Sequence, residues 1–246
     1  MVTIKETPSR FWRVRKLVHR DRQPEWMDQP ELEAVQHHRA LHGLAVLNWW
    51  SGRSRPYHAP IRRLVPQVPG SLRILDLACG GGDVAIHLAR WGKRQGLRLE
   101  IVGIDRSDVA IEFARHNAQR AGVEVEFIRH TIGEDPLPEG FDVVLASLFL
   151  HHLDEGDAVE LLRSVRQSVR HAVLVNDLVR SPLAYTLVWW ASRLLTRSPV
   201  VHYDGPRSVA AAFTPPEMLD IAAQAGWDRR TVVRCFPCRM LLQCWK

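Results

Sequence analysis

The chain has 246 residues and a formal net charge of +6, with 46% hydrophobic and 24% charged residues. These values are ordinary for a soluble globular protein, and no run approaches the ~20 apolar residues of a membrane-spanning helix. No secretory leader and no regular framework among the four cysteines is visible, so we expect a protein of the reducing cytoplasm. The arginines are scattered, and no nucleic-acid partner is predicted.

The N-terminal residues are predicted to be helical and to precede the main domain. Residues 1–20 are basic with interspersed apolar side chains, which indicates a short amphipathic helix or a frayed arm. Residues 31–50 carry apolar side chains at helical spacing, and a further helix is expected from Pro60 onward. We therefore divide the chain into a helical extension or cap over 1–69 and a main domain over 70–246.

A strand, a glycine turn and a helix are predicted at the start of the main domain. The apolar run 73–77 is typical of a buried strand, and three glycines follow at 80–82. Apolar residues then recur at helical spacing through residue 90. Glycine permits positive φ and the close approach of a ligand to the backbone, and the helix start presents free N–H groups. This is the plan of a nucleotide-binding crossover.

Two kinds of cofactor are compatible with this turn. The pattern Gly80-x-Gly82-x-x-Ala85 is that of dinucleotide-binding proteins, and an acidic residue, Asp105, follows at about the expected distance. However, the carboxylate of Asp76 at the end of the strand would repel a pyrophosphate. The same carboxylate suits a cationic ligand, such as the ammonium and sulfonium groups of S-adenosylmethionine (SAM). An NAD(P)-dependent reductase stays open as an alternative.

The motif Asp76-x-Ala78-x-Gly80-x-Gly82 resembles motif I of the class I SAM-dependent methyltransferases. Ala78 stands where the first glycine of that motif is usual, a small departure that leaves the cofactor assignment largely intact. Residues 137–147 resemble the fourth core strand of the same enzymes. The resemblance implies an α/β fold with a Rossmann-like, doubly wound sheet of seven strands, mostly parallel with the last strand antiparallel. It also implies SAM as the cofactor and S-adenosylhomocysteine (SAH) as the product.

The resemblance places the cofactor along the carboxyl ends of the strands, where ligand sites of open α/β sheets lie. The glycine turn would hold the methionine half, and Asp105 the ribose. Arg106 could instead accommodate the 2′-phosphate of a nicotinamide cofactor. The predicted cofactor-binding residues are Asp76, Ala78, Cys79, Gly80, Gly82, Asp105, Arg106, Thr131, Ile132, Ser147 and Leu148. The strands expected after the first are 101–105, 125–130, one within 137–147, 172–177, 231–235 and 240–245.

An insertion at about 179–212 interrupts the alternation of strands and helices. Residues 182–196 predict an unusually apolar helix, and 199–205 are expected to lead back out of it. In the family resembled, an insertion at this place often builds a lid. We expect the lid to line a hydrophobic pocket, with peripheral contact to a membrane surface or pairing with a second subunit as the alternatives.

Two adjacent histidines, His151 and His152, are the candidate catalytic residues, because an imidazole can remove a proton from a phenol or enol near neutral pH. They could instead only shape the methionine pocket, since alignment of the reactants can suffice. No metal site is predicted, because Cys235 and Cys238 form a single C-x-x-C without a second pair. The predicted substrate-binding residues are Trp49, Leu150, His151, Trp189 and Tyr203.

We therefore expect an enzyme that transfers a methyl group from SAM to a small hydrophobic acceptor. The resemblance is to the branch that includes quinone-biosynthesis enzymes and the polyketide- or phenol-modifying enzymes of secondary metabolism, which indicates an aromatic acceptor methylated at oxygen. C-methylation of a quinone-type acceptor is an alternative, as are a reductase and a non-catalytic scaffold. An RNA or DNA methyltransferase is a further alternative, but Ser147-Leu-Phe-Leu150 lacks the Asn/Asp-Pro-Pro-aromatic signature of base-flipping enzymes.

Overall fold

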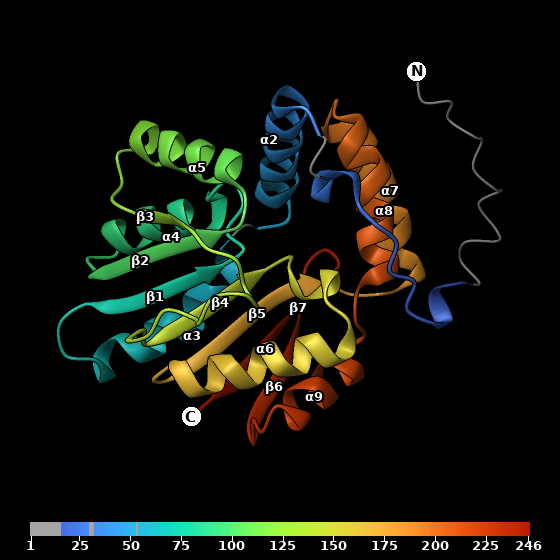
Figure 1. Ribbon diagram of the computed structural model, residues 1–246. Helices are drawn as coiled ribbons and strands as arrows, with labels where there is room; N and C mark the ends of the chain where they lie inside the picture. Colours follow the sequence, from blue (N-terminus) through green and yellow to red (C-terminus); the bar gives the residue numbers. More distant parts are fainter. Residues whose placement is uncertain (1–15, 30–31, 53) are drawn as a thin grey trace.

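The computed structural model describes residues 16–29, 32–52 and 54–246, and a seven-stranded sheet forms its centre (Figure 1). The strand order is β3-β2-β1-β4-β5-β7-β6; β7 runs antiparallel to both neighbours, and the other adjacent strands pair in parallel. The predicted seven-stranded, mostly parallel sheet is therefore confirmed. The strands are β1 (Leu72–Leu77), β2 (Leu99–Asp105), β3 (Glu126–Arg129), β4 (Val143–Ser147), β5 (Ala172–Leu178), β6 (Arg229–Cys235) and β7 (Arg239–Trp245).

The central strands are mainly apolar because helices cover both faces of the sheet. Every residue of β5 is buried, whereas the edge strand β3 buries only Phe127. Successive side chains of a strand point to opposite faces, and the core accordingly divides into two clusters. Leu75 and Leu77 of β1 belong to one cluster, and Ile74 belongs to the other.

Five helices pack on the two faces of the sheet. The helices α3 (Arg55–Leu64), α4 (Asp83–Arg94) and α5 (Asp108–Ala121) contribute to the cluster that contains Ile74. The helices α6 (Glu155–Ser168) and α9 (Pro215–Gln224) contribute to the opposite cluster. The helix α9 begins with a capping box, in which Thr214 and Glu217 exchange side-chain and backbone hydrogen bonds.

Three more helices gather beyond the carboxyl ends of the central strands (Figure 1). They are α2 (Ala34–Trp50), α7 (Pro182–Leu195) and α8 (Pro199–Ala211), and each packs against the other two. Short 3₁₀ turns complete the described chain: η1 (Lys16–Val18), η2 (Trp26–Asp28), η3 (Val65–Gln67) and η4 (Leu150–His152). No helix in the described ranges is long and apolar enough to cross a membrane.

Two helix boundaries differ from the prediction. The helix α3 begins at Arg55 instead of Pro60, because Pro56 occupies its first turn and Tyr57 begins the buried face that Ile61 continues. Residues 199–205 do not lead out of the insertion but begin the helix α8, whose N-cap is Ser198. The prediction for residues 1–20 lies outside the described residues as far as residue 15.

A close helix contact explains how α8 tolerates a glycine in its interior. A Cβ at Gly205 would lie 3.1 Å from the side chain of Val188 on α7. The absence of that carbon lets the two helices of the insertion approach closely. The position of the neighbouring helix thus shows why Gly205 stands inside a helix.

Candidate active site

A cavity of about 880 Å³ lies between the carboxyl ends of the strands and the helices α2, α7 and α8. This volume is within the range of small-molecule sites. One part of the cavity follows the turn after β1 and the ends of β2, β3 and β4. The other part is lined by the insertion, by η4 and by the segment around η2. The two sets of lining residues adjoin at the end of β4, where Ser147 and Leu148 line the cavity.

The turn after β1 is built for close approach to the backbone. Ala78, Gly80 and Gly82 have positive φ angles of 49°, 52° and 74°. A Cβ at Gly82 would lie 2.7 Å from the ring of Phe127, so only glycine fits there without a shift of that ring. Asp105 fixes the turn by accepting hydrogen bonds from the backbone N–H of Gly80 at 2.9 Å and of Ser107 at 2.9 Å. The Asp105 carboxylate lines the cavity at the end of β2.

Asp76 and Gly82, two of the predicted cofactor residues, are not among the residues that line the cavity. Asp76 is a carboxylate buried beneath the turn, without a hydrogen-bond partner in the described part of the chain. Its side chain is 1% exposed, and neither carboxylate oxygen has a hydrogen-bond partner there. Burial raises the pKa of Asp76 well above its usual range, and the nearby carboxylates of Asp83 and Asp105 raise it further. A buried carboxylate is costly unless a cation or hydrogen-bond donors compensate it. A cationic group such as the ammonium of SAM fits this requirement.

We expect Asp76 to couple cofactor binding to proton release. A cationic ligand favours the ionised carboxylate, so binding lowers the raised pKa of Asp76 and releases a proton wherever the free protein is still protonated. The affinity for SAH should therefore rise with pH until the raised pKa of Asp76 in the free protein is passed, as long as the ligand's amino group stays protonated. Calorimetry in buffers of different ionisation enthalpy measures the released proton. The control Asp76→Asn should bind weakly and without proton release, and wild-type binding that is independent of pH would contradict the expectation.

The ends of β2 and β3 form the far end of this part of the cavity. Arg106, Thr131, Ile132 and Glu134 all line it. His130 lines it too, and its Nε2 is buried without a hydrogen-bond partner among the described residues. His130 was not predicted as a site residue, because a single histidine at the end of a short strand belongs to no recognisable sequence motif.

His151 and Asp177 form a buried pair at the other end of the cavity. His151 Nδ1 lies 2.7 Å from Asp177 Oδ1, and the two side chains are 3% and 1% exposed. The backbone N–H groups of His151 and Leu178 also donate to Asp177, at 3.1 and 2.7 Å. Burial alone would raise the pKa of Asp177, but His151 and these hydrogen bonds outweigh it, so the pKa lies below its usual value. An ionised carboxylate only accepts hydrogen bonds, so Nδ1 carries the proton and Nε2 points to the cavity side.

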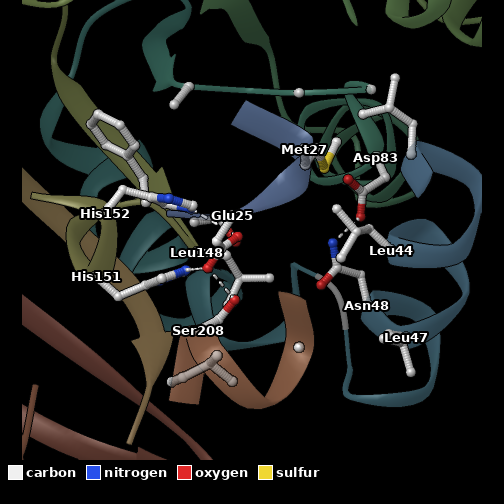
Figure 2. Close-up of a pocket in the computed structure, with 18 of the residues that line it drawn as sticks. Glu25, Met27, Leu44, Leu47, Asn48, Asp83, Leu148, His151, His152 and Ser208 are labelled. Atoms are coloured by element: carbon white, nitrogen blue, oxygen red, sulfur yellow. Dashed lines mark hydrogen bonds and ion pairs between the residues drawn. The ribbon is translucent and has the colours of Figure 1, made fainter. Parts of the chain in front are cut away.

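Glu25, which was not predicted as a site residue, places a second carboxylate near His151 at this end of the cavity. Its Oε1 accepts a hydrogen bond from Ser208 Oγ at 2.6 Å and lies 3.9 Å from His151 Nε2. Its Oε2 lies 4.0 Å from His152 Nε2. Figure 2 shows this polar group of Glu25, His151, His152 and Ser208 together on one side of the pocket. No sequence signal marks Glu25, because its role depends on where the N-terminal segment lies.

Specific contacts hold that N-terminal segment against the insertion and η4. Arg20 donates to the carbonyl oxygens of Ala211 and His151 at 2.5 and 2.8 Å. The backbone N–H of Trp26 donates to Asp204 at 2.8 Å, and its ring stacks on Tyr203 with centroids 4.1 Å apart. These contacts place Glu25 at the polar end of the cavity.

Apart from these polar groups, the part of the cavity near the insertion is mainly apolar. Its walls include Leu44, Leu47 and Trp50 of α2 and Leu187, Trp190 and Leu194 of α7. Four predicted substrate residues do not line the cavity. Trp49 is 62% exposed, and Leu150 lies in the core. Tyr203 stacks on Trp26, and Trp189 packs edge-on against Trp190. The structure therefore brings the neighbouring residues Trp50 and Trp190 to the cavity, because helical periodicity turns adjacent side chains by about 100°.

Comparisons with known proteins agree with this architecture. A family model described as a methyltransferase domain matches residues 74–172. The ubiquinone biosynthesis O-methyltransferase of Roseobacter denitrificans is 29% identical over 204 residues, which cover 73% of this chain and 77% of that protein. The corresponding enzyme of Alkalilimnicola ehrlichii is 34% identical over 196 residues, covering 75% of this chain and 74% of that protein. This chain belongs to the class I SAM-dependent methyltransferases.

Solved structures show the same fold at lower identity. The magnesium protoporphyrin IX methyltransferase of Synechocystis with bound SAH has a TM-score of 0.53 at 17% identity, covering 96% of this chain and 94% of that one. Human N-acetylserotonin methyltransferase with SAM has a TM-score of 0.59 at 18% identity, covering 96% and 66%. A putative O-methyltransferase of Nostoc punctiforme has a TM-score of 0.55 at 21% identity; 83% of this chain aligns with it, and the chain spans only 61% of its length.

Membership of the family establishes this methyltransferase as an enzyme that uses SAM. The predicted family and cofactor are confirmed, and the reductase alternative is set aside.

Proposed function

We propose that this methyltransferase transfers the methyl group of SAM to a hydroxyl oxygen of a small, hydrophobic, aromatic acceptor of the phenol or quinol type. The observation that carries the proposal is an apolar chamber with one buried imidazole–carboxylate pair at its polar end. A hydrophobic ring fits between α2 and α7, and its hydroxyl group would face His151. The curated relatives act in ubiquinone biosynthesis, as their names state, which supports an acceptor of this chemistry.

The cofactor residues proposed from the sequence fit their roles. We assign Asp76 to the ammonium group, Asp105 to the ribose, and the turn at Ala78–Gly82 to the methionine half. The residues Ser147 and Leu148 lie where the two parts of the cavity meet and would face the reacting end. When bound, SAM supplies a methyl group attached to a positively charged sulfur.

In this proposal His151 moves the acceptor's proton. Asp177 holds the proton on Nδ1, which leaves the Nε2 lone pair available for the hydroxyl proton of the acceptor. The imidazolium formed then lies between Asp177 and Glu25, and both carboxylates stabilise its charge. The residues 1–69 and 179–212 would act as the cap and lid that exclude water from this end.

The direct test is a series of phenols that differ only in an alkyl or aryl substituent. Burial of apolar surface contributes about 0.8 kcal/mol per CH₂, so each added methylene that enters the chamber should raise kcat/KM by about fourfold until the chamber is full. The variant Trp190→Ser should flatten the series, whereas Trp49→Ser, an exposed control on α2, should not. Equal kcat/KM values for short and long acceptors would contradict the proposal.

Removal of metal ions tests the role of the same polar group. Glu25, His151 and His152 place their ligating atoms within 4.8 Å of one another, so this group could hold a cation. We expect activity to be unchanged by EDTA, since the proposed proton transfer needs only the imidazole. Loss of activity that is restored by Mg²⁺ or Mn²⁺ would show instead that the three residues bind a metal.

A further inference from the structure

Four polar side chains of the central sheet, at or below the cavity, have buried polar atoms without a hydrogen-bond partner among the described residues. The atoms are both oxygens of Asp76 on β1, both amide atoms of Asn176 on β5, Oγ of Ser147 on β4, and Nη1 of Arg239 on β7. Buried polar groups in folded proteins are normally paired. Four such groups in one sheet therefore indicate a missing partner.

The first two groups lie on the same face of the sheet. Asp76 is opposite Leu145 in the parallel pairing of β1 with β4, and Ser147 follows Leu145 by two residues. Ser147 is in turn opposite Asn176 in the pairing of β4 with β5. Directly opposed side chains, and those two residues apart on one strand, point to the same face. Asp76, Ser147 and Asn176 thus share one face across three adjacent strands.

Arg239 continues the row on the next strand. Leu178 follows Asn176 by two residues and is directly opposite Arg239 in the pairing of β5 with β7. Tyr57 of α3 covers this face, and its hydroxyl donates to the carbonyl of Ala146 at 3.1 Å. Burial raises the pKa of Tyr57, Asp76 raises it further, and Arg239 lowers it, so both charges act on the same hydroxyl.

Arg239 is an internal cation with spare hydrogen-bonding capacity. Its side chain is 5% exposed and lines the cavity, and Nη2 donates to Asn48 Oδ1 at 2.5 Å. Arg239 takes part in none of the ion pairs found between described residues. Burial lowers the pKa of its guanidinium group. A guanidinium group has five donors and binds a carboxylate through two parallel hydrogen bonds. An anion at Nη1 would satisfy this group.

We propose that Arg239, with Asn176 beside it, binds the carboxylate of the amino-acid part of the cofactor while Asp76 binds its ammonium group. An α-amino acid carries both charges on one carbon, so a single ligand group can compensate an internal anion and an internal cation that share one face of the sheet. The assignment concerns the cofactor that the family establishes, and it is independent of the acceptor proposed above.

The position of Arg239 also connects this subsite with the wall of the acceptor chamber. Asn48 receives the hydrogen bond from Arg239 and donates to Asp83 Oδ2 at 2.8 Å. Asn48 is in the last turns of α2, and Asp83 is the first residue of α4. Figure 2 shows Asn48 and Asp83 facing each other across from the histidine group. A carboxylate on Arg239 would therefore order the end of α2 next to the acceptor chamber.

A ligand-truncation experiment tests the proposal without acceptor and without turnover. Calorimetry compares SAH with its decarboxylated analogue, 5′-S-(3-aminopropyl)-5′-thioadenosine, on the wild type and on Arg239→Gln. We expect the wild type to prefer SAH by about 10- to 100-fold, the usual effect of hydrogen bonds to a charged group. In Arg239→Gln this preference should fall to about 1, and the affinity for the analogue should change by less than about threefold. The exposed control Arg234→Gln on β6 should behave as the wild type.

Two results would overturn the proposal. Equal wild-type affinities for SAH and the analogue would show that the carboxylate is not recognised, whether or not the variant folds. If Arg239→Gln loses affinity for SAH and for the analogue by the same factor, the role of Arg239 is only structural. If that variant does not fold, Arg239→Lys replaces it, because lysine keeps the charge but lacks the planar guanidinium group. Its preference for SAH over the analogue should lie between those of the wild type and of 1. A preference as large as that of the wild type would count against the proposal. A failed acceptor series leaves this measurement unaffected.

Discussion

The variant His151→Ala should lower kcat by about 10²- to 10⁴-fold, the usual contribution of a positioned general base. The loss follows from the geometry, because His151 is held by Asp177 at 2.7 Å and lines the cavity at its polar end. SAH should bind to the variant with an affinity within about threefold of the wild type, since His151 lines the end of the cavity away from Asp105, the residue proposed to bind the ribose. Single-turnover kinetics with saturating SAM and acceptor measures the chemical step directly.

Two further variants show whether the effect belongs to the base. In Asp177→Asn the imidazole loses its ionised partner and the tautomer is no longer held, so kcat should also fall. The exposed His116→Ala on α5 should leave kcat unchanged. If His151→Ala retains a kcat within tenfold of the wild type, alignment of the reactants carries the reaction and the imidazole only shapes the site.

The variant Asp105→Ala should weaken SAH binding by about 100-fold or more. A carboxylate that accepts hydrogen bonds from two ribose hydroxyls loses two interactions of the charge-assisted kind, each worth about 1.5–3 kcal/mol. The same side chain holds the backbone N–H of Gly80 at 2.9 Å, so its removal also loosens the turn that carries the methionine half. Calorimetric titration with SAH is the measurement.

The matched control for this variant is Asp108→Ala. Asp108 is an exposed carboxylate three residues further along and pairs with Arg129 at 3.2 Å on the surface, where such pairs contribute little. Its removal should leave SAH binding unchanged within about twofold. If Asp105→Ala binds SAH as tightly as the wild type does, the ribose is recognised elsewhere and the assignment of the site is wrong.

Local patterns were sufficient for the sheet and for the glycine turn after β1. A buried strand needs a continuous apolar run, a tight turn needs glycine, and a helix start needs a cap, and each of these requirements is met by residues adjacent in the chain. The turn at Ala78–Gly82 and the position of Asp105 at the end of β2 could be located for that reason. The capping box of α9 at Thr214 is a local feature of the same kind.

The acceptor side depends on contacts that no local pattern specifies. The sequence selected Trp49 and Trp189, but the rotation of α2 and α7 brings Trp50 and Trp190 to the cavity instead. A one-residue difference in a helix turns a side chain by about 100°, and only the packing of the neighbouring helices selects the inward face.

What the sequence determined by itself is the chemistry that depends on neighbouring residues: the strand–turn–helix around Asp76, the family and its cofactor. What only the tertiary structure decided is which distant groups meet. Glu25 and His151 are 126 positions apart in the sequence, and Arg239 and Asn48 are 191 positions apart, yet each pair is in contact or nearly so in the folded chain. Such meetings follow from the sheet order and from the packing of the insertion, because burial and charge compensation are properties of the folded chain and not of any segment alone.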